Sequence, residues 1–233
     1  AAAIPMHNMD AAMVELHRVM DDLGARGVQI FTNIKGRALD DPDFAPVFDA
    51  MAEYDQPIWL HPVRTADVTD YAAEPKSRFE LWWTFGWPYD TSVAMTRLVF
   101  DGLFDRHPDI KIITHHLGGM IPYFEGRVDG GLMVLGARTT DEDYSDVLSS
   151  LKKPHGEYFK MFYGDTAMFG AHIGIRCGIE YYGADHVVFA SDAPVGGPTV
   201  NAFQAIDRLE LDEAVRNKIC FENAARLMNT TFD

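Results

Sequence analysis

The chain alternates short strand-forming runs with longer helix-forming stretches, and this alternation constrains its fold more than any other feature. The runs are rich in β-branched and aromatic residues, whereas the stretches between them carry apolar residues at three- and four-residue spacing. This order is typical of βα units, which build a parallel sheet. The predicted strands are residues 28–33, 57–61, 110–116, 159–165 and 186–192.

The helix-forming stretches complete the same pattern. The first ends at Gly24, a residue suited to close a helix, and the last is broken. With 233 residues, 47% of them hydrophobic, the chain can bury one sizeable core, and nothing in the composition marks a domain boundary. The predicted helices are residues 13–23, 46–54, 91–105 and 205–228.

The predicted fold class is α/β, and a (β/α)8 TIM-type barrel fits it better than a doubly wound sheet. Each predicted strand ends on a polar residue, and both folds gather their active site at that edge. The chain contains neither GxGxxG nor GxxxxGK[ST], so no nucleotide site is indicated. Five strands do not close a barrel, which needs roughly 250 residues. We therefore expect residues 1–233 to form a single barrel domain that lacks about its first three strands, and so is incomplete at the N-terminus.

Net charge and cysteine content exclude several classes of partner. The formal charge is −15 and no run of Lys or Arg occurs, which argues against nucleic acid and anionic membranes as partners. No signal peptide or membrane span is indicated, and Cys177 and Cys220 show no CxxC spacing. These observations predict a soluble, cytoplasmic protein.

The segment around His61 is the first candidate site. His61 ends an apolar strand, and Pro62 turns the chain out of that strand, so the imidazole faces the mouth of a barrel. There it either ligates a metal ion or bonds a backbone carbonyl in the core. Arg64 either meets a substrate carboxylate or is an ordinary surface charge.

Two adjacent histidines precede a glycine pair at the end of another strand. Neighbouring residues on a strand point to opposite faces, so only one of His115 and His116 can face the barrel centre. A histidine there suits a general acid or base, and the alternative is a structural turn. Arg127 follows on the next helix, where an ion pair with a nearby acid is the simplest reading.

Asp192 ends the last predicted strand. A carboxylate there suits a divalent metal and proton transfer, although an N-cap or Asx-turn is the alternative. Asp165 also ends a predicted strand, but we expect it at most to contact the residues that form the site, without taking part in the chemistry itself. The aromatic segment 81–88 either walls a substrate pocket or belongs to the core.

Taken together in this order, these motifs resemble the amidohydrolase-related family of aminocarboxymuconate-semialdehyde decarboxylase and the non-oxidative aromatic acid decarboxylases. The resemblance covers essentially the whole chain. The first residues of this chain resemble the end of the family's third strand. The family's His-x-His pair on the first strand has no counterpart here. The matching segments are Leu60-His61-Pro62, His116-Leu117-Gly118-Gly119 with Gly126-Arg127, and Ala190-Ser191-Asp192-Ala193-Pro194.

The resemblance implies a role for each matched residue. His61 and Asp192 become ligands of one divalent metal, zinc or manganese, and His116 becomes the catalytic histidine, with Asp192 sharing the proton transfer. Arg127 matches an arginine that holds a substrate carboxylate in a neighbouring subunit, which implies a homodimer.

The function implied is metal-dependent non-oxidative decarboxylation of an aromatic or unsaturated carboxylic acid. Hydrolysis of a lactone or amide on the same site is an alternative enzyme function. An inactive barrel fragment that serves binding or assembly is the alternative from another class.

Overall fold

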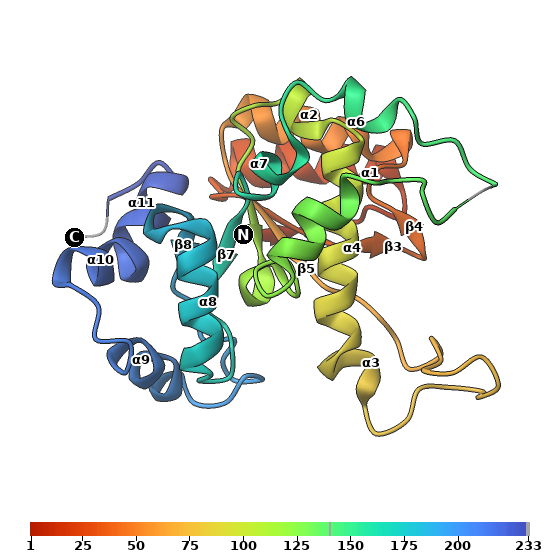
Figure 1. The fold of residues 1–233 in the computed structure, drawn as a ribbon. Coiled ribbons are helices and arrows are strands. Elements are labelled where there is room, and N and C mark those ends of the chain that lie inside the picture. Colours follow the sequence, from red (N-terminus) through yellow and green to blue (C-terminus); the bar gives the residue numbers. More distant parts are fainter. Residues whose placement is uncertain (140, 232–233) are drawn as a thin grey trace.

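A computed structural model describes residues 1–139 and 141–231, and six parallel strands form its main sheet (Figure 1). The sheet order is β1-β2-β5-β6-β7-β8, and each of the five predicted segments contains one of these strands. The predicted α/β class is therefore confirmed. The strands are β1 (Ala2–Ala3), β2 (Val28–Phe31), β5 (Ile58–His61), β6 (Ile112–Thr114), β7 (Tyr163–Asp165) and β8 (Val187–Val188), and a separate antiparallel hairpin joins β3 (Asn33–Ile34) to β4 (Arg37–Ala38).

Helices connect the strands, and some of them begin or end at a residue that favours a helix boundary. The Asn8 side chain accepts a hydrogen bond from the N–H of Ala11 at the start of α1, and Gly24 adopts the left-handed conformation just after η1. The helical elements are α1 (Met9–His17), η1 (Arg18–Asp22), η2 (Pro42–Phe44), α2 (Ala45–Tyr54), α3 (Leu81–Thr84), α4 (Gly86–Phe100), α5 (Leu103–Arg106), η3 (His115–Gly118), η4 (Arg127–Gly131), α6 (Val147–Ser150), α7 (His155–Phe159), α8 (His172–Tyr182), η5 (Ala184–His186), α9 (Thr199–Asp207), α10 (Glu213–Asn217), η6 (Lys218–Glu222) and α11 (Asn223–Leu227).

Several predicted boundaries are wrong, among them those of a helix and a strand whose errors have a clear cause. The helix predicted over 91–105 is divided, because Gly102 takes a left-handed conformation with φ of 73° between α4 and α5. The strand predicted over 159–165 begins only at Tyr163, since Phe159 ends α7. A short buried apolar run does not by itself distinguish a strand from the end of a helix.

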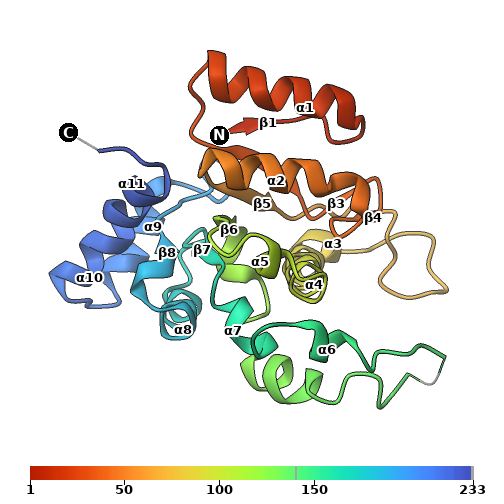
Figure 2. The same ribbon diagram turned by 90° about the horizontal axis from the view of Figure 1, so that it is seen from above.

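The two faces of the sheet bury different cores. The larger core lies against helices α1, α2, α4 and α8, whose arrangement Figure 2 shows. The opposite face, called here the inner face, carries a small cluster of Ile113, Val188 and Leu227, with Trp59 and Tyr163 packed against it. Parallel strands place neighbouring residues on alternate faces. The inner face therefore leads directly to the strand ends where the candidate residues lie.

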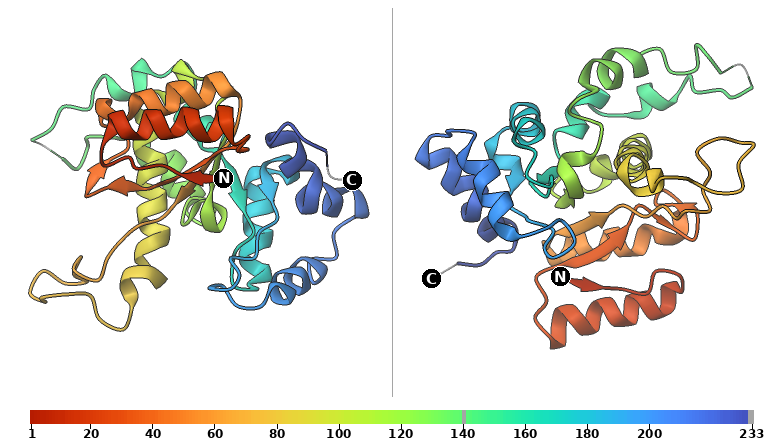
Figure 3. Two further views of the ribbon diagram at one scale, coloured as in Figure 1. Left: turned by 180° about the vertical axis from the view of Figure 1, so that it is seen from behind. Right: turned by 90° about the horizontal axis from the view of Figure 1, so that it is seen from below.

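Among the described residues the sheet stays open, since β1 and β8 each pair with one neighbour only. Figure 3 shows the N-terminus at the β1 end of the sheet and the C-terminal helices beside β8. Within the same residues, no helix has both the length and the apolar character that crossing a bilayer requires.

The larger core should dominate stability. Leu60 is fully buried on the face of β5 that meets this core, so Leu60→Ala should lower the free energy of unfolding by about 2 to 5 kcal/mol. Val14 is 70% exposed on α1, and Val14→Ala should change that free energy by less than about 0.5 kcal/mol. Urea denaturation of both variants tests this expectation, and equal effects would contradict it.

Candidate active site

Two imidazoles meet at the carboxyl ends of β5 and β6. Leu60 pairs with Thr114, so the next residues on the two strands, His61 and His115, come side by side. Their ring centroids are 4.7 Å apart in an edge-to-face arrangement. The strand order thus places two histidines that are distant in sequence in direct contact.

His115, rather than His116, takes the position on the inner face. Ile113 lies on that face, Thr114 is buried on the other side, and His115 returns to the inner face against His61. His116 follows in a left-handed turn, with its ring 5.9 Å from that of His115. Both histidines therefore border the same space, which the rule of alternating faces alone did not predict.

The turn after β6 is held by a buried carboxylate. His116, Leu117, Gly118 and Gly119 all have positive φ, a conformation that L-residues adopt only when their surroundings enforce it. Asp165 is 2% exposed, and its Oδ1 accepts hydrogen bonds from the N–H groups of His116 (2.8 Å) and Ala167 (3.1 Å). Asp165, expected to play a minor supporting part, therefore fixes the backbone of the histidine turn.

Hydrogen bonds determine the tautomer of two of the three imidazoles. Nδ1 of His61 lies 2.6 Å from the carbonyl oxygen of Pro62, and Nδ1 of His116 contacts the carbonyl oxygen of Ala167. Because a carbonyl oxygen only accepts, Nδ1 of His61 and of His116 carries the proton and Nε2 keeps a lone pair. Nδ1 of His115 lies 3.2 Å from Oδ2 of Asp165, but that contact is not aligned as a hydrogen bond.

Burial makes His61 a neutral base. Desolvation lowers the pKa of His61, and a positive charge on His115 lowers it further. The bond to Pro62 and the negative charge of Asp192 oppose this effect without overcoming it. A neutral imidazole with a free Nε2 is the form that ligates a metal ion.

The Asp192 side chain forms no hydrogen bond with the histidines of the described residues. Asp192 lies beyond β8 in a left-handed conformation with φ of 54°, and its charge acts on His61 without a hydrogen bond between the two. Throughout residues 1–139 and 141–231, no three His, Cys, Asp or Glu side chains come close enough to hold a metal ion. The imidazole donors suit a divalent cation in kind, but the described residues do not complete its coordination.

Aromatic side chains lie against His61, and one of them, Trp87, belongs to the aromatic segment 81–88. Trp87 lies 5.5 Å and Phe31 lies 5.8 Å from the His61 ring, both edge-on. The indole N–H of Trp87 donates to the carbonyl oxygen of Arg64, which fixes the ring. Phe31 was missed from the sequence, since a strand-end phenylalanine gives no signal that distinguishes it from core.

Arg64 is not a free surface charge, so that alternative is wrong. Its side chain is half-buried, and Nη1 lies 3.1 Å from Oδ1 of Asp90 on α4. Burial raises the pKa of Asp90, while the Arg64 charge opposes the rise. Both residues line a cavity of about 830 Å³, and Phe31 also lines it and contacts His61.

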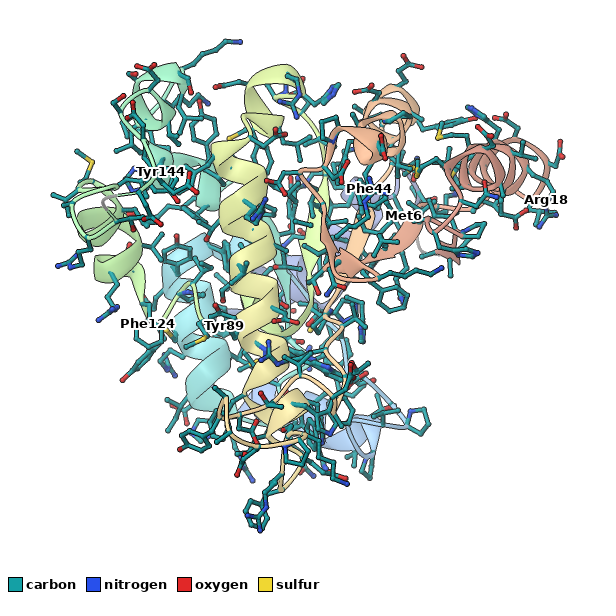
Figure 4. All side chains as sticks on the ribbon, turned by 90° about the vertical axis from the view of Figure 1, so that its right-hand side faces the viewer. Met6, Arg18, Phe44, Tyr89, Phe124 and Tyr144 are labelled. Carbon is teal, nitrogen blue, oxygen red and sulfur yellow. The ribbon has the colours of Figure 1, made fainter. Side chains whose placement is uncertain are left out.

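Arg127 lies on another part of the surface. It begins η4, is exposed, and forms no ion pair with an acid of the described residues, so the predicted pairing with a nearby acid is not observed. Beside it is a hollow of about 480 Å³ with a largely apolar lining. Tyr89, which belongs to α4, and Phe124, which precedes η4, both help to line this hollow and are labelled next to each other in Figure 4.

The chain belongs to the amidohydrolase family, whose model matches residues 1–229. It is 30% identical over 129 residues to 2-amino-3-carboxymuconate-6-semialdehyde decarboxylase of Dictyostelium discoideum, an alignment that covers 55% of this chain and 34% of that protein. It is 29% identical over 238 residues to gamma-resorcylate decarboxylase of a Polaromonas species, covering 97% of this chain and 68% of that protein.

A solved structure agrees with these relatives. Dihydroxybenzoic acid decarboxylase from Polaromonas sp. JS666, with bound manganese and the inhibitor 2-nitroresorcinol, superposes with a TM-score of 0.79 and 27% identity. The match covers 98% of this chain and 68% of that one. The resemblance to aromatic acid decarboxylases is therefore confirmed in both sequence and fold.

The left-handed turn should tolerate substitution poorly. At Gly118 a Cβ atom would lie 2.0 Å from Oη of the buried Tyr182, whereas at Gly36, also at positive φ, it would meet nothing. Gly118→Ala should lower the free energy of unfolding by about 2 to 4 kcal/mol, and Gly36→Ala by about 1 kcal/mol. Chemical denaturation compares the two variants, and equal losses would contradict the role of Tyr182.

The lowered pKa of His61 should make the metal-free protein less stable in acid. As pH falls through the ordinary histidine value of about 6.5, the unfolded chain takes up this proton before the folded protein does. The associated stability is therefore complete above that value and decreases below it. The loss should be smaller in His61→Asn, as urea denaturation between pH 5 and 8 would measure; parallel pH profiles would contradict the expectation.

Proposed function

We propose that the protein is a metal-dependent non-oxidative decarboxylase of an aromatic carboxylic acid. The observation that carries this proposal is His61, a neutral imidazole with Nδ1 held by Pro62, a free Nε2 and an aromatic enclosure. The relatives named above are decarboxylases and support the same reaction.

The reaction needs a proton but no oxidant. The bond between the ring carbon and its carboxyl group breaks, its electron pair stays on the ring carbon, a proton is added there, and carbon dioxide leaves. His116 is the proposed proton donor: with Nδ1–H bonded to the Ala167 carbonyl oxygen, it takes up a proton from solvent on Nε2 and transfers that proton to the ring carbon, while Asp165 fixes its backbone. Asp192 is proposed to share the proton transfer.

The proposed ligands in this chain are His61 and Asp192. When bound, a divalent cation would polarise the oxygens of the substrate and stabilise negative charge on them. Manganese occurs in the Polaromonas structure, and histidine with carboxylate also suits zinc, so we propose one of these two ions.

The substrate is proposed to be a flat acid. Trp87 and Phe31 offer ring edges beside His61, which suit an aromatic ring. Arg64 could meet the carboxylate from the neighbouring cavity in place of Asp90.

We further propose a homodimer. Arg127 is exposed next to an apolar hollow, and a second copy covering that hollow would bring the guanidinium into its partner's site. Cys177 and Cys220 are free thiols, which suits the reducing conditions of the cytoplasm, where we propose that the protein acts.

His116 and His61 should affect activity differently. In the full-length protein loaded with manganese, His116→Ala should lower carbon dioxide release from gamma-resorcylate or a related hydroxybenzoate by about 10²- to 10⁴-fold with metal retained. His61→Ala should also lose metal, measured by elemental analysis. Exposed His17 on α1 supplies the control, His17→Ala, which should retain both properties.

Full activity in His116→Ala would contradict its catalytic role. Lactone ring opening without carbon dioxide release would instead favour the hydrolase. Absence of metal from the wild-type protein, with no change in His61→Ala, would favour a binding or assembly protein.

A further inference from the structure

We propose that Phe169 is a specificity-determining residue of the candidate active site, and that its ring packs against the aromatic ring of the substrate. This inference rests on the proposed function, because it adds a contact to the same substrate. Phe169 lies in the turn after β7, a segment to which no substrate contact has been assigned. The rings beside Phe169, its exposure and its backbone conformation support the assignment.

Phe169 completes a closed circuit of aromatic rings at the candidate site. Its centroid lies 6.3 Å from that of His116 and 6.1 Å from that of Trp83, and among the described residues it alone joins these two rings. Neighbouring rings of the circuit are 4.7 to 6.3 Å apart, which is the range for interacting aromatic rings. The circuit passes through His61, His115, His116, Phe169, Trp83 and Trp87 and returns to His61.

The size of this circuit suits one further aromatic ring. Six steps of this length keep a ring at the centre within roughly 6 Å of the surrounding rings, which is a contact distance for aromatic pairs. His116 is the proposed proton donor, so the reacting carbon of the substrate must come within about 3 Å of its Nε2. A substrate ring that reaches His116 from inside the circuit therefore also meets Phe169.

The Phe169 ring offers an uncovered apolar surface. The residue is 52% exposed, whereas Phe159 and Phe162 in the same stretch of chain are fully buried in the larger core. Single exposed apolar residues are common and need no function, and Phe221 on η6 is 45% exposed as well. Phe169 differs because its ring contacts lead directly to His116.

The backbone holds Phe169 at the tip of a closed turn. Its φ is 51°, a left-handed conformation that is unfavourable for a non-glycine residue, and Gly170 follows with φ of 80°. The N–H of Ala171 donates to the carbonyl oxygen of Met168 at 2.9 Å and closes the turn over both residues. Strained residues of this kind cluster at functional sites. The turn thus presents the ring in a fixed place, as a pocket wall that selects substrates by shape requires.

A contact with substrate must be distinguished from support of His116. The carbonyl oxygen of Ala167, which accepts from Nδ1 of His116, lies two residues before Phe169. A change at Phe169 that displaced this carbonyl group would impair proton transfer, lowering kcat and shifting its pH dependence. Loss of a substrate contact alone would raise KM and leave kcat nearly unchanged.

The test compares Phe169→Leu and Phe169→Asn in the full-length protein loaded with manganese. Leucine removes the ring but stays apolar, while asparagine tolerates a left-handed turn. We expect both variants to raise KM for gamma-resorcylate about two- to tenfold, as loss of one aromatic contact should, with kcat changed by less than about twofold. Phe221→Leu is the matched control and should behave like wild type. Circular dichroism checks that each variant is folded.

Methylated substrates measure selectivity directly. Gamma-resorcylate is compared with two analogues that carry one additional methyl group, at ring position 3 or at ring position 4. The smaller side chains at position 169 leave room for that group. The ratio of kcat/KM for at least one methylated acid to kcat/KM for gamma-resorcylate should therefore rise at least about fivefold.

Calorimetry in the His116→Ala background, where turnover should be lost, separates this inference from the proposed function. If His116→Ala/Phe169→Leu binds gamma-resorcylate more weakly than His116→Ala does, the contact is supported even if the wild-type protein releases no carbon dioxide and the proposed function fails. Equal binding, or unchanged KM and selectivity in both folded Phe169 variants, would overturn the inference and leave the decarboxylase intact. A lower kcat with a shifted pH profile and unchanged KM would overturn it too.

Discussion

The carboxylate of Asp165 is the interaction on which the candidate site depends. One oxygen binds two backbone N–H groups of the turns after β6 and β7, and the other faces the His115 ring. Loss of this acceptor would leave the N–H groups of His116 and Ala167 without their hydrogen-bond partner, which costs more than a single hydrogen bond normally contributes. Two strands and two histidines are thereby held in one arrangement.

Much of this arrangement could be predicted from the sequence. The five strand segments are visible as apolar runs, and parallel strands bring their ends together, so His61 and the histidine pair were expected at one edge. The sequence could not show which of His115 and His116 faces inward, because both border the site once the strand ends at Thr114. A left-handed turn at non-glycine residues depends on tertiary contacts, here those of Asp165.

Contacts between segments that are distant in the sequence could not be predicted from it either. Arg64 looked like a surface charge until the structure brought it to Asp90, 26 positions further along the chain. Tertiary packing half-buries the Arg64 side chain and places Phe31 beside His61. The spacing of apolar residues along the chain indicates helices and strands. Contacts such as that between Arg64 and Asp90 depend instead on how the helices pack on the sheet.

The neutrality of His61 has a consequence for charge balance. If the proposed divalent cation were bound, neutral His61 would leave its charge unchanged, and Asp192 would cancel only half of that charge. The chain as a whole carries a formal charge of −15, so its long-range field repels anions. Attraction of an anionic acid would therefore begin only within about a Debye length, roughly 8 Å at physiological salt, of that residual positive charge.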